Sequence, residues 1–169
     1  MCKLLLGLIC FTILFGYSAD EVREVYDVKV AEVEQIERNE PETDEMFSED
    51  EKYLLAKIAM AEAESCDTQT KSYVIMTVLN RVKTNGFPNS IKEVIFEKRG
   101  TTYQFSPIGD GRWDKVEPNE DCWLAVEAVI NSEDYSQGAL YFESCTNSDN
   151  WHSRNLQFLY KSNGLRFYK

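Results

Sequence analysis

Histidine is almost absent from this chain of 169 residues, which contains only His152. Most zinc amidases and peptidases bind their metal through two or more histidines. The sequence therefore argues against a zinc hydrolase.

Basic clusters are also missing, and the acidic residues are concentrated in one segment. Between Asp20 and Glu51 there are fourteen Asp or Glu and three Lys or Arg, a difference that equals the whole net charge of −11. Without a basic patch, nucleic acid is not an expected partner. An acidic segment with few aromatic residues buries too little apolar surface to offset its ordering entropy. We therefore predict that residues 20–47 form an acidic, disordered linker.

Only the N-terminus carries a long apolar run, from Leu4 to Phe15. Lys3 precedes it and the small residues of 16–19 follow it, which is the layout of a secretory signal peptide. The run is short for a bilayer span. We predict a signal peptide over 1–19, a secreted or cell-envelope location, and no stable membrane insertion after cleavage; an uncleaved anchor is the alternative.

Cysteine is scarce in the remaining chain. Of five cysteines, Cys2 and Cys10 fall within the predicted signal peptide. Cys66, Cys122 and Cys145 permit at most one internal disulfide, and the sequence does not indicate which pair would form it. The oligomeric state is equally open.

Helix signals dominate the segment 48–169, which we predict to be a single α+β domain with a small β element. The Ser48–Glu51 capping box starts a helix that continues to about Glu64. Further helices are predicted at 67–83, 90–96 and 118–130, and strands at 138–143, 155–160 and 165–168. A long loop, with room for a short strand, is predicted at 97–116.

Glu62 lies on the wrong face of the first helix. At about 100° per residue, it falls among Leu54, Leu55 and Ile58 in the middle of the apolar face, whereas Glu64 falls on the polar side. A charged carboxylate that is buried and unpaired costs several kcal/mol. Glu62 is therefore either paired or near a helix end that reaches solvent, or it has a raised pKa and serves as a proton donor. Periodicity does not decide between these.

Five short segments follow one another along the predicted domain. They are AEA at 61–63, VLNRV at 78–82, FPNSIKEVI at 87–95, QFSP at 104–107 and GALYF at 138–142. Each segment is weak alone, but together, in this order and at ordinary spacings, they are specific. From about Tyr53 to Tyr168 the chain resembles the SleB/CwlJ cell-wall hydrolase family.

The resemblance implies a fold similar to lysozyme-like transglycosylases and cleavage of peptidoglycan glycan strands, with Glu62 as the catalytic acid and base. Two segments depart from the family pattern. Glu64, Ser65 and Cys66 follow Glu62-Ala63 where the family often continues Arg-Gly-Glu, so the arginine and the second glutamate are absent. Leu165 stands where many relatives have histidine. The segments do not distinguish spore cortex from other walls.

The bond between N-acetylmuramic acid and N-acetylglucosamine breaks when its leaving oxygen is protonated. In a lytic transglycosylase, Glu62 would donate that proton and then remove one from the muramyl 6-hydroxyl as the 1,6-anhydro ring closes. This chemistry requires no metal and no organic cofactor.

Residues of the predicted loop and strand are candidates for binding the sugar. We expect Gln104, Ser106 and Tyr141 to line the cleft and contact the substrate. Hydrolysis by water would need a second carboxylate. Asp110 and Asp114 are the candidates, although ordinary turn residues are the more frequent interpretation of such a sequence.

Two alternatives belong to other functional classes. A cysteine-dependent wall endopeptidase would use Cys122 at a helix N-terminus with His152. Cys122 is followed by bulky Trp123 and Leu124 and lies on an apolar helix face, which favours a core position. The other alternative is a wall-binding module without catalysis.

Overall fold

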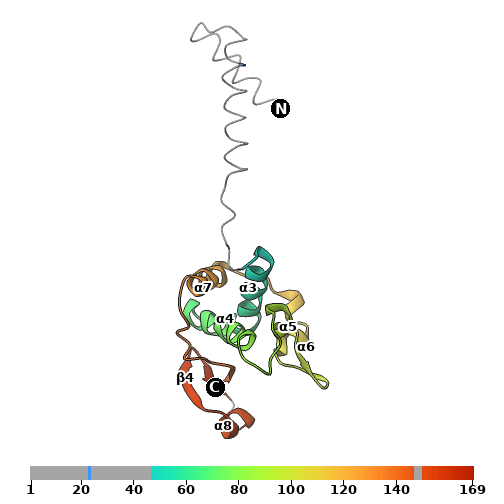
Figure 1. Cartoon of the computed structure of the whole chain (residues 1–169), viewed down its shortest axis with the longest axis vertical. Coiled ribbons are helices and arrows are strands. Elements are labelled where there is room, and N and C mark those ends of the chain that lie inside the picture. Colours follow the sequence, from blue (N-terminus) through green and yellow to red (C-terminus); the bar gives the residue numbers. More distant parts are fainter. Residues whose placement is uncertain (1–22, 24–46, 147–149) are drawn as a thin grey trace. The chain divides into compact units, whose positions relative to one another are not determined.

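Three helices make up the centre of the computed structural model, which describes residues 23, 47–146 and 150–169 (Figure 1). They are α3 (Glu49–Ala63), α4 (Thr68–Val82) and α7 (Glu120–Ile130). All three begin where the sequence predicts. Their N-cap side chains, which accept hydrogen bonds from backbone N–H groups of the first turn, are Ser48, Asp67 and Asn119. The predicted signal peptide and all but two residues of the predicted linker, Arg23 and Phe47, lie outside the described residues.

The main hydrophobic core lies between these helices and the short helix α5 (Ile91–Ile95). Fully buried side chains from α3, α4 and α7 meet there, and the largest are Leu55, Ile58, Ile75, Val78 and Val126. Complete burial of such a side chain stabilises the fold by about 1.5–3 kcal/mol. The core therefore holds α3, and with it Glu62, in a fixed orientation.

The segment predicted as a long loop with room for a short strand contains two short strands, but the helices in it were not predicted. It forms β1 (Lys98–Arg99), β2 (Thr102–Tyr103), the helix α6 (Ser106–Asp110) and the 3₁₀ helix η1 (Trp113–Lys115). α6 is five residues long, which is too short to show a helical period in the sequence. Pro107 in its first turn and Gly111 at its end, with φ +77°, define its limits.

A three-stranded antiparallel sheet forms the C-terminal part of the chain. Its strands, in the spatial order β3-β5-β4, are β3 (Tyr141–Ser144), β5 (Leu165–Tyr168) and β4 (Phe158–Ser162). The turn between β4 and β5 has positive φ at Asn163 and Gly164, the two-residue hairpin that the sequence indicates. The predicted starts of β3 and β4 are each three residues too early. Helix α8 (Trp151–Asn155), which has five residues, was not predicted.

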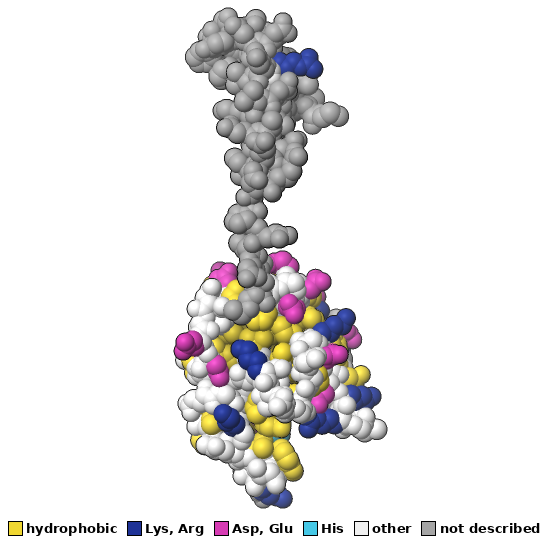
Figure 2. Space-filling view, in the orientation of Figure 1, with side chains coloured by type: hydrophobic (Ala, Val, Ile, Leu, Met, Phe, Trp, Pro, Cys, Tyr) yellow, Lys and Arg dark blue, Asp and Glu magenta, His cyan; other side chains and the backbone are white. Residues whose placement is uncertain are grey.

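A second, smaller core joins the sheet to the helices. Phe167 of β5 is fully buried against Val74 of α4 and Ala63 of α3. The described residues thus form a helix-rich α+β unit with small antiparallel sheets, as predicted. Acidic and basic side chains are interspersed on the face shown in Figure 2. Among the described helices, none combines the length and apolar character needed to cross a bilayer.

Candidate functional site

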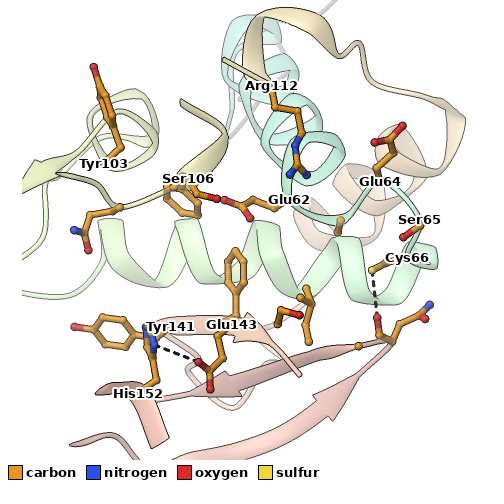
Figure 3. Close-up of a pocket in the computed structure, with 18 of the residues that line it drawn as sticks. Glu62, Glu64, Ser65, Cys66, Tyr103, Ser106, Arg112, Tyr141, Glu143 and His152 are labelled. Atoms are coloured by element: carbon orange, nitrogen blue, oxygen red, sulfur yellow. Dashed lines mark hydrogen bonds and ion pairs between the residues drawn. The ribbon is translucent and has the colours of Figure 1, made fainter. Parts of the chain in front are cut away.

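A cleft of about 970 Å³ lies at the end of α3 and is bounded by the segment 103–112 and by the sheet. Figure 3 shows its two sides. Glu62, Ser106 and Arg112 belong to the helix side, and Tyr141, Glu143, Trp151 and His152 belong to the sheet side. Segments far apart in the sequence therefore contribute to one site.

Glu62 lies in the last turn of α3, directly between the buried Ala61 and Ala63. Burial of the carboxyl raises its pKa from 4.5 to about 7. The nearby Arg112 opposes this rise, the carboxylate of Asp110 adds to it, and Arg81 and the backbone N–H of Ser106 again favour the charged form. The balance leaves a carboxyl that is partly protonated at neutral pH.

The arginines near Glu62 are held by other groups. Arg112 Nη1 donates to the backbone oxygen of Ala61 at 2.9 Å, and Arg81 Nε donates to that of Leu140 at 2.7 Å. Within the described residues neither arginine forms an ion pair with Glu62. Of the interpretations that the sequence allowed, a raised pKa therefore describes Glu62 better than an ion pair does. Glu62 also lies near the end of α3 and borders the cleft, as one of the other interpretations expects.

Arg81 connects α4 to the sheet side of the cleft. It is buried, its guanidinium carbon is 4.9 Å from the Phe105 ring centroid and 5.3 Å from that of Tyr141, and burial lowers its pKa to about 10. The preceding Asn80 Nδ2 donates to Ser136 Oγ at 3.0 Å and to the Ala139 oxygen at 3.2 Å. These bonds fix the loop that leads into β3.

The three side chains predicted to bind substrate, Gln104, Ser106 and Tyr141, all line the cleft. Their role as substrate ligands stays a prediction. Asp110 and Asp114, considered as a second carboxylate, are exposed and do not line the cleft. Asp110 Oδ1 instead accepts the backbone N–H of Arg112 at 2.9 Å, which is the bond of an ordinary turn.

The sequence analysis did not identify two cleft residues on the sheet side, Glu143 and Trp151. Glu143 is buried, and Trp151 is among the most exposed aromatic residues described. Glu143 could have been identified from strand alternation, because it lies two residues after the predicted cleft residue Tyr141 and therefore on the same strand face. Glu64, assigned from the sequence to the polar surface, is exposed but also borders the cleft.

Cys122, considered above as a nucleophile, lies in the core and does not line the cleft. Cys66, Cys122 and Cys145 are all free thiols. Cys122 is fully buried in the main core, its Sγ lies 3.9 Å from Met60 Sδ, and burial raises its thiol pKa. A nucleophilic thiolate needs an accessible, electropositive environment, which Cys122 lacks. In the part of the chain that the structure describes, no group of three or more His, Cys, Asp or Glu is arranged to hold a metal.

The chain is similar in sequence to cell-wall-degrading proteins. The sequence profile of the family described as Cell Wall Hydrolase matches residues 65–168, a range that starts three residues after Glu62. The chain is 34% identical over 96 residues to the spore cortex-lytic enzyme of Bacillus subtilis (strain 168), covering 57% of this chain and 30% of that protein. The corresponding enzyme of Oceanobacillus iheyensis is 33% identical over 97 residues, with 57% and 33% covered. The chain thus spans about a third of these relatives.

Two solved structures are similar to the described fold. The catalytic domain of the Bacillus cereus SleB protein has a TM-score of 0.62 at 28% identity, covering 73% of this chain and 92% of that one. The catalytic domain of the germination-specific lytic transglycosylase SleB from Bacillus anthracis has a TM-score of 0.62 at 27% identity, covering 73% and 97%.

Proposed function

The chain belongs to the cell wall hydrolase family, and from this premise we propose that it cleaves the glycan strand of peptidoglycan as a lytic transglycosylase with Glu62 as its catalytic acid and base. The observation that carries the proposal is the environment of Glu62. Its carboxyl borders the cleft and has a pKa raised by burial to about 7. A group with such a pKa can both donate and accept a proton near neutral pH.

The chemistry proceeds in two proton transfers. The protonated Glu62 donates to the glycosidic oxygen while the bond from that oxygen to C1 of N-acetylmuramic acid breaks. The resulting Glu62 carboxylate then takes the proton of the muramyl 6-hydroxyl as that oxygen bonds to C1. The products are an N-acetylglucosamine end and a 1,6-anhydro-muramyl end, and Glu62 returns to its protonated form.

Arg112 and Arg81 support the second step. Their positive charges make the pKa of Glu62 lower than burial alone would make it. They therefore reduce the free-energy cost of the Glu62 carboxylate that forms after the first proton transfer. Gln104, Ser106 and Tyr141 line the same cleft and would hold the sugar through amide, hydroxyl and ring contacts. We further propose that the substrate is met outside the cytoplasmic membrane, after removal of a signal peptide at 1–19.

The test compares the wild-type chain with Glu62→Gln on purified peptidoglycan, with mass spectrometry of the released fragments. We expect anhydro-muramyl ends from the wild type and a loss of at least about 10²-fold in their release from the variant. Glu64→Gln is the matched control, because Glu64 borders the same cleft but is exposed. It should retain most of the activity.

Other products would contradict the proposal in defined ways. Reducing muramyl ends would show hydrolysis by water, and cut peptides would show an endopeptidase. Retained binding to peptidoglycan with no product from the wild type would leave a wall-binding module. Full activity of Glu62→Gln would exclude Glu62 as the acid.

A further inference from the structure

Arg112 is an exposed cation that lines the cleft beside the proposed catalytic acid. It lies at the N-cap of η1, directly after the turn that ends α6. Its Nη1 donates to the backbone oxygen of Ala61 at 2.9 Å, and Figure 3 shows its guanidinium pointing toward α3, beside Glu62. The bond to Ala61 holds the guanidinium in place and uses only one of its N–H groups.

Three arginines line the cleft, and they differ in exposure and in partners. They are Arg81, Arg99 and Arg112. Arg81 is only 4% exposed, and Arg99 Nε forms an ion pair with Glu97 Oε1 at 2.7 Å. Arg112 forms no ion pair with any residue that the structure describes. Among these three arginines, Arg112 is therefore the one that is exposed and has no carboxylate partner in the described part of the chain.

A guanidinium held in this way is suited to bind a carboxyl group of a ligand. Arginine presents its N–H groups in a planar fork that matches the two oxygens of a carboxylate, and its charge strengthens each hydrogen bond. Glu62 does not occupy the fork, because the two side chains form no ion pair. The remaining N–H groups of Arg112 are therefore available to a group bound in the cleft.

The proposed substrate carries such a carboxyl group on only one of its two sugars. N-acetylmuramic acid differs from N-acetylglucosamine by a lactyl ether on the C3 oxygen, and this lactyl group ends in a carboxyl. C3 and C1 belong to the same ring, and C1 is the atom that the leaving oxygen departs from when Glu62 donates its proton. A muramyl residue with C1 beside Glu62 thus brings its lactyl group into the region of the cleft that Arg112 borders.

We propose that Arg112 selects N-acetylmuramic acid as the sugar whose C1 faces Glu62, by donating hydrogen bonds to the lactyl carboxyl group. The carboxylate accepts them where the lactyl group carries no peptide, and the amide oxygen accepts them where a stem peptide is attached. A strand shifted by one sugar places N-acetylglucosamine there and loses these bonds, which disfavours the wrong register. The inference deepens the proposed function and rests on it for the class of substrate.

The test measures binding without turnover, in the full chain carrying Glu62→Gln. In this parent Arg112 cannot act through the pKa of Glu62, so a change in affinity reports its contact with the ligand. Two tetrasaccharides are titrated by isothermal calorimetry. One alternates N-acetylglucosamine with peptide-free N-acetylmuramic acid, and the other contains N-acetylglucosamine alone and therefore no lactyl group. We expect the parent to bind the muramyl tetrasaccharide about tenfold more tightly, as for one hydrogen bond to a charged group.

Substitutions of Arg112 in this parent should change the preference between the two ligands. Arg112→Gln removes the charge and the fork, so we expect the affinity for the muramyl tetrasaccharide to fall about tenfold and that for the other to change less than about twofold. Arg112→Lys keeps the charge and should retain part of the preference. Lys115→Gln is the matched control, because Lys115 is an exposed residue of η1 that does not line the cleft. It should bind both ligands like the parent.

Three results would overturn the role of Arg112. They are a parent that binds both tetrasaccharides equally or binds neither, an unchanged preference in Arg112→Gln, and an equal loss of affinity for both ligands, which a purely structural role predicts. Thermal unfolding followed by circular dichroism checks that each variant is folded. Failure of the proposed function gives a different result, because full glycan cleavage by Glu62→Gln would refute the acid. A preference lost only in the Arg112 variants would still support the muramyl site in that case.

Discussion

The Glu62 side chain combines two properties that conflict in most proteins. It is ionisable, and it lies on the helix face that packs into the core, beside the buried Ile58 and Ala61. Burial disfavours its charged form, while Arg112 and Arg81 favour that form. The resulting pKa of about 7 places the protonation change within the range where an acid-base catalyst is most effective.

The pH dependence of activity follows from this pKa. We expect the rate of glycan cleavage by the wild type to fall as the pH rises through about 7, because only the protonated Glu62 can donate to the leaving oxygen. The measurement is the initial rate of fragment release between pH 5 and pH 9, with circular dichroism as a check on folding. A rate that stays constant up to pH 9 would refute the assignment.

Stability measurements on Glu62→Gln provide an independent control. In the folded protein the pKa of Glu62 is raised above its ordinary value of 4.5. As the pH rises from 4.5 to about 7, the unfolded state loses this proton more readily than the folded state, so the wild type becomes less stable. The neutral amide of Glu62→Gln has no such pH dependence. We therefore expect the variant to be more stable than the wild type at pH 8, by about 1–3 kcal/mol after allowance for partial exposure. The two should be similar at pH 4. If wild type and Glu62→Gln were equally stable at pH 4 and at pH 8, burial would not disfavour the charged form of Glu62.

Among the elements, α4 positions both sides of the cleft. At its start, Lys71 is buried, and its Nζ donates to the backbone oxygens of Glu64, at 3.3 Å, and of Cys66. These oxygens belong to the turn that follows Glu62. At its end, Asn80 and Arg81 hold the loop that leads into β3. A single helix thus fixes the position of Glu62 relative to Tyr141 and the rest of the sheet side.

Replacing Lys71 with methionine tests the first of these connections. Lys71→Met keeps an apolar chain of similar length but removes the donor, which leaves the carbonyls of the α3–α4 turn without their partner. We expect the free energy of unfolding to fall by about 2–4 kcal/mol, measured by guanidinium denaturation. Lys83→Met, at the exposed end of α4, is the control and should change it by less than about 0.5 kcal/mol. A loss for Lys71→Met as small as that of the control would contradict the role of Lys71.

For the whole molecule, the net charge is divided unevenly between the two parts of the chain. Residues 1–45 have eleven acidic and four basic residues, a net charge of −7, and residues 46–169 carry the remaining −4. The compact unit Met46–Lys169 contains both hydrophobic cores and every residue of the cleft. A unit with its own core can fold independently. We therefore expect that the part of the chain before it is not needed for the site.

Deleting residues 1–46 tests this independence. We expect the fragment 47–169 to cleave peptidoglycan like the full chain and to unfold within about 2 °C of it, because no core residue is lost. A fragment 52–169 is the matched comparison, since it also lacks Ser48 and Glu51, which form the capping box of α3. Its stability should be lower by about 1 kcal/mol or more. A fragment 47–169 that fails to fold would contradict the prediction.

The sequence by itself determined the features that depend on neighbouring residues. Ser48, Asp67 and Asn119 marked the starts of the main helices, because a cap acts on N–H groups two or three residues away. The period of α3 placed Glu62 on the buried face. The short helices α6 and α8 were not predicted, because five residues are too few to show a helical period of apolar residues.

Only the tertiary structure decided what surrounds Glu62. Arg112, Ser106 and Asp110 act on its carboxyl from a segment more than forty residues further along the chain, and a pKa depends on distances that the order of residues does not contain. The pairing of β3 with β5 likewise set Glu143 against Tyr168 and into the cleft. The sequence thus indicated one acid on an apolar helix face. Folding determined its protonation and supplied a second carboxylate in the same cleft.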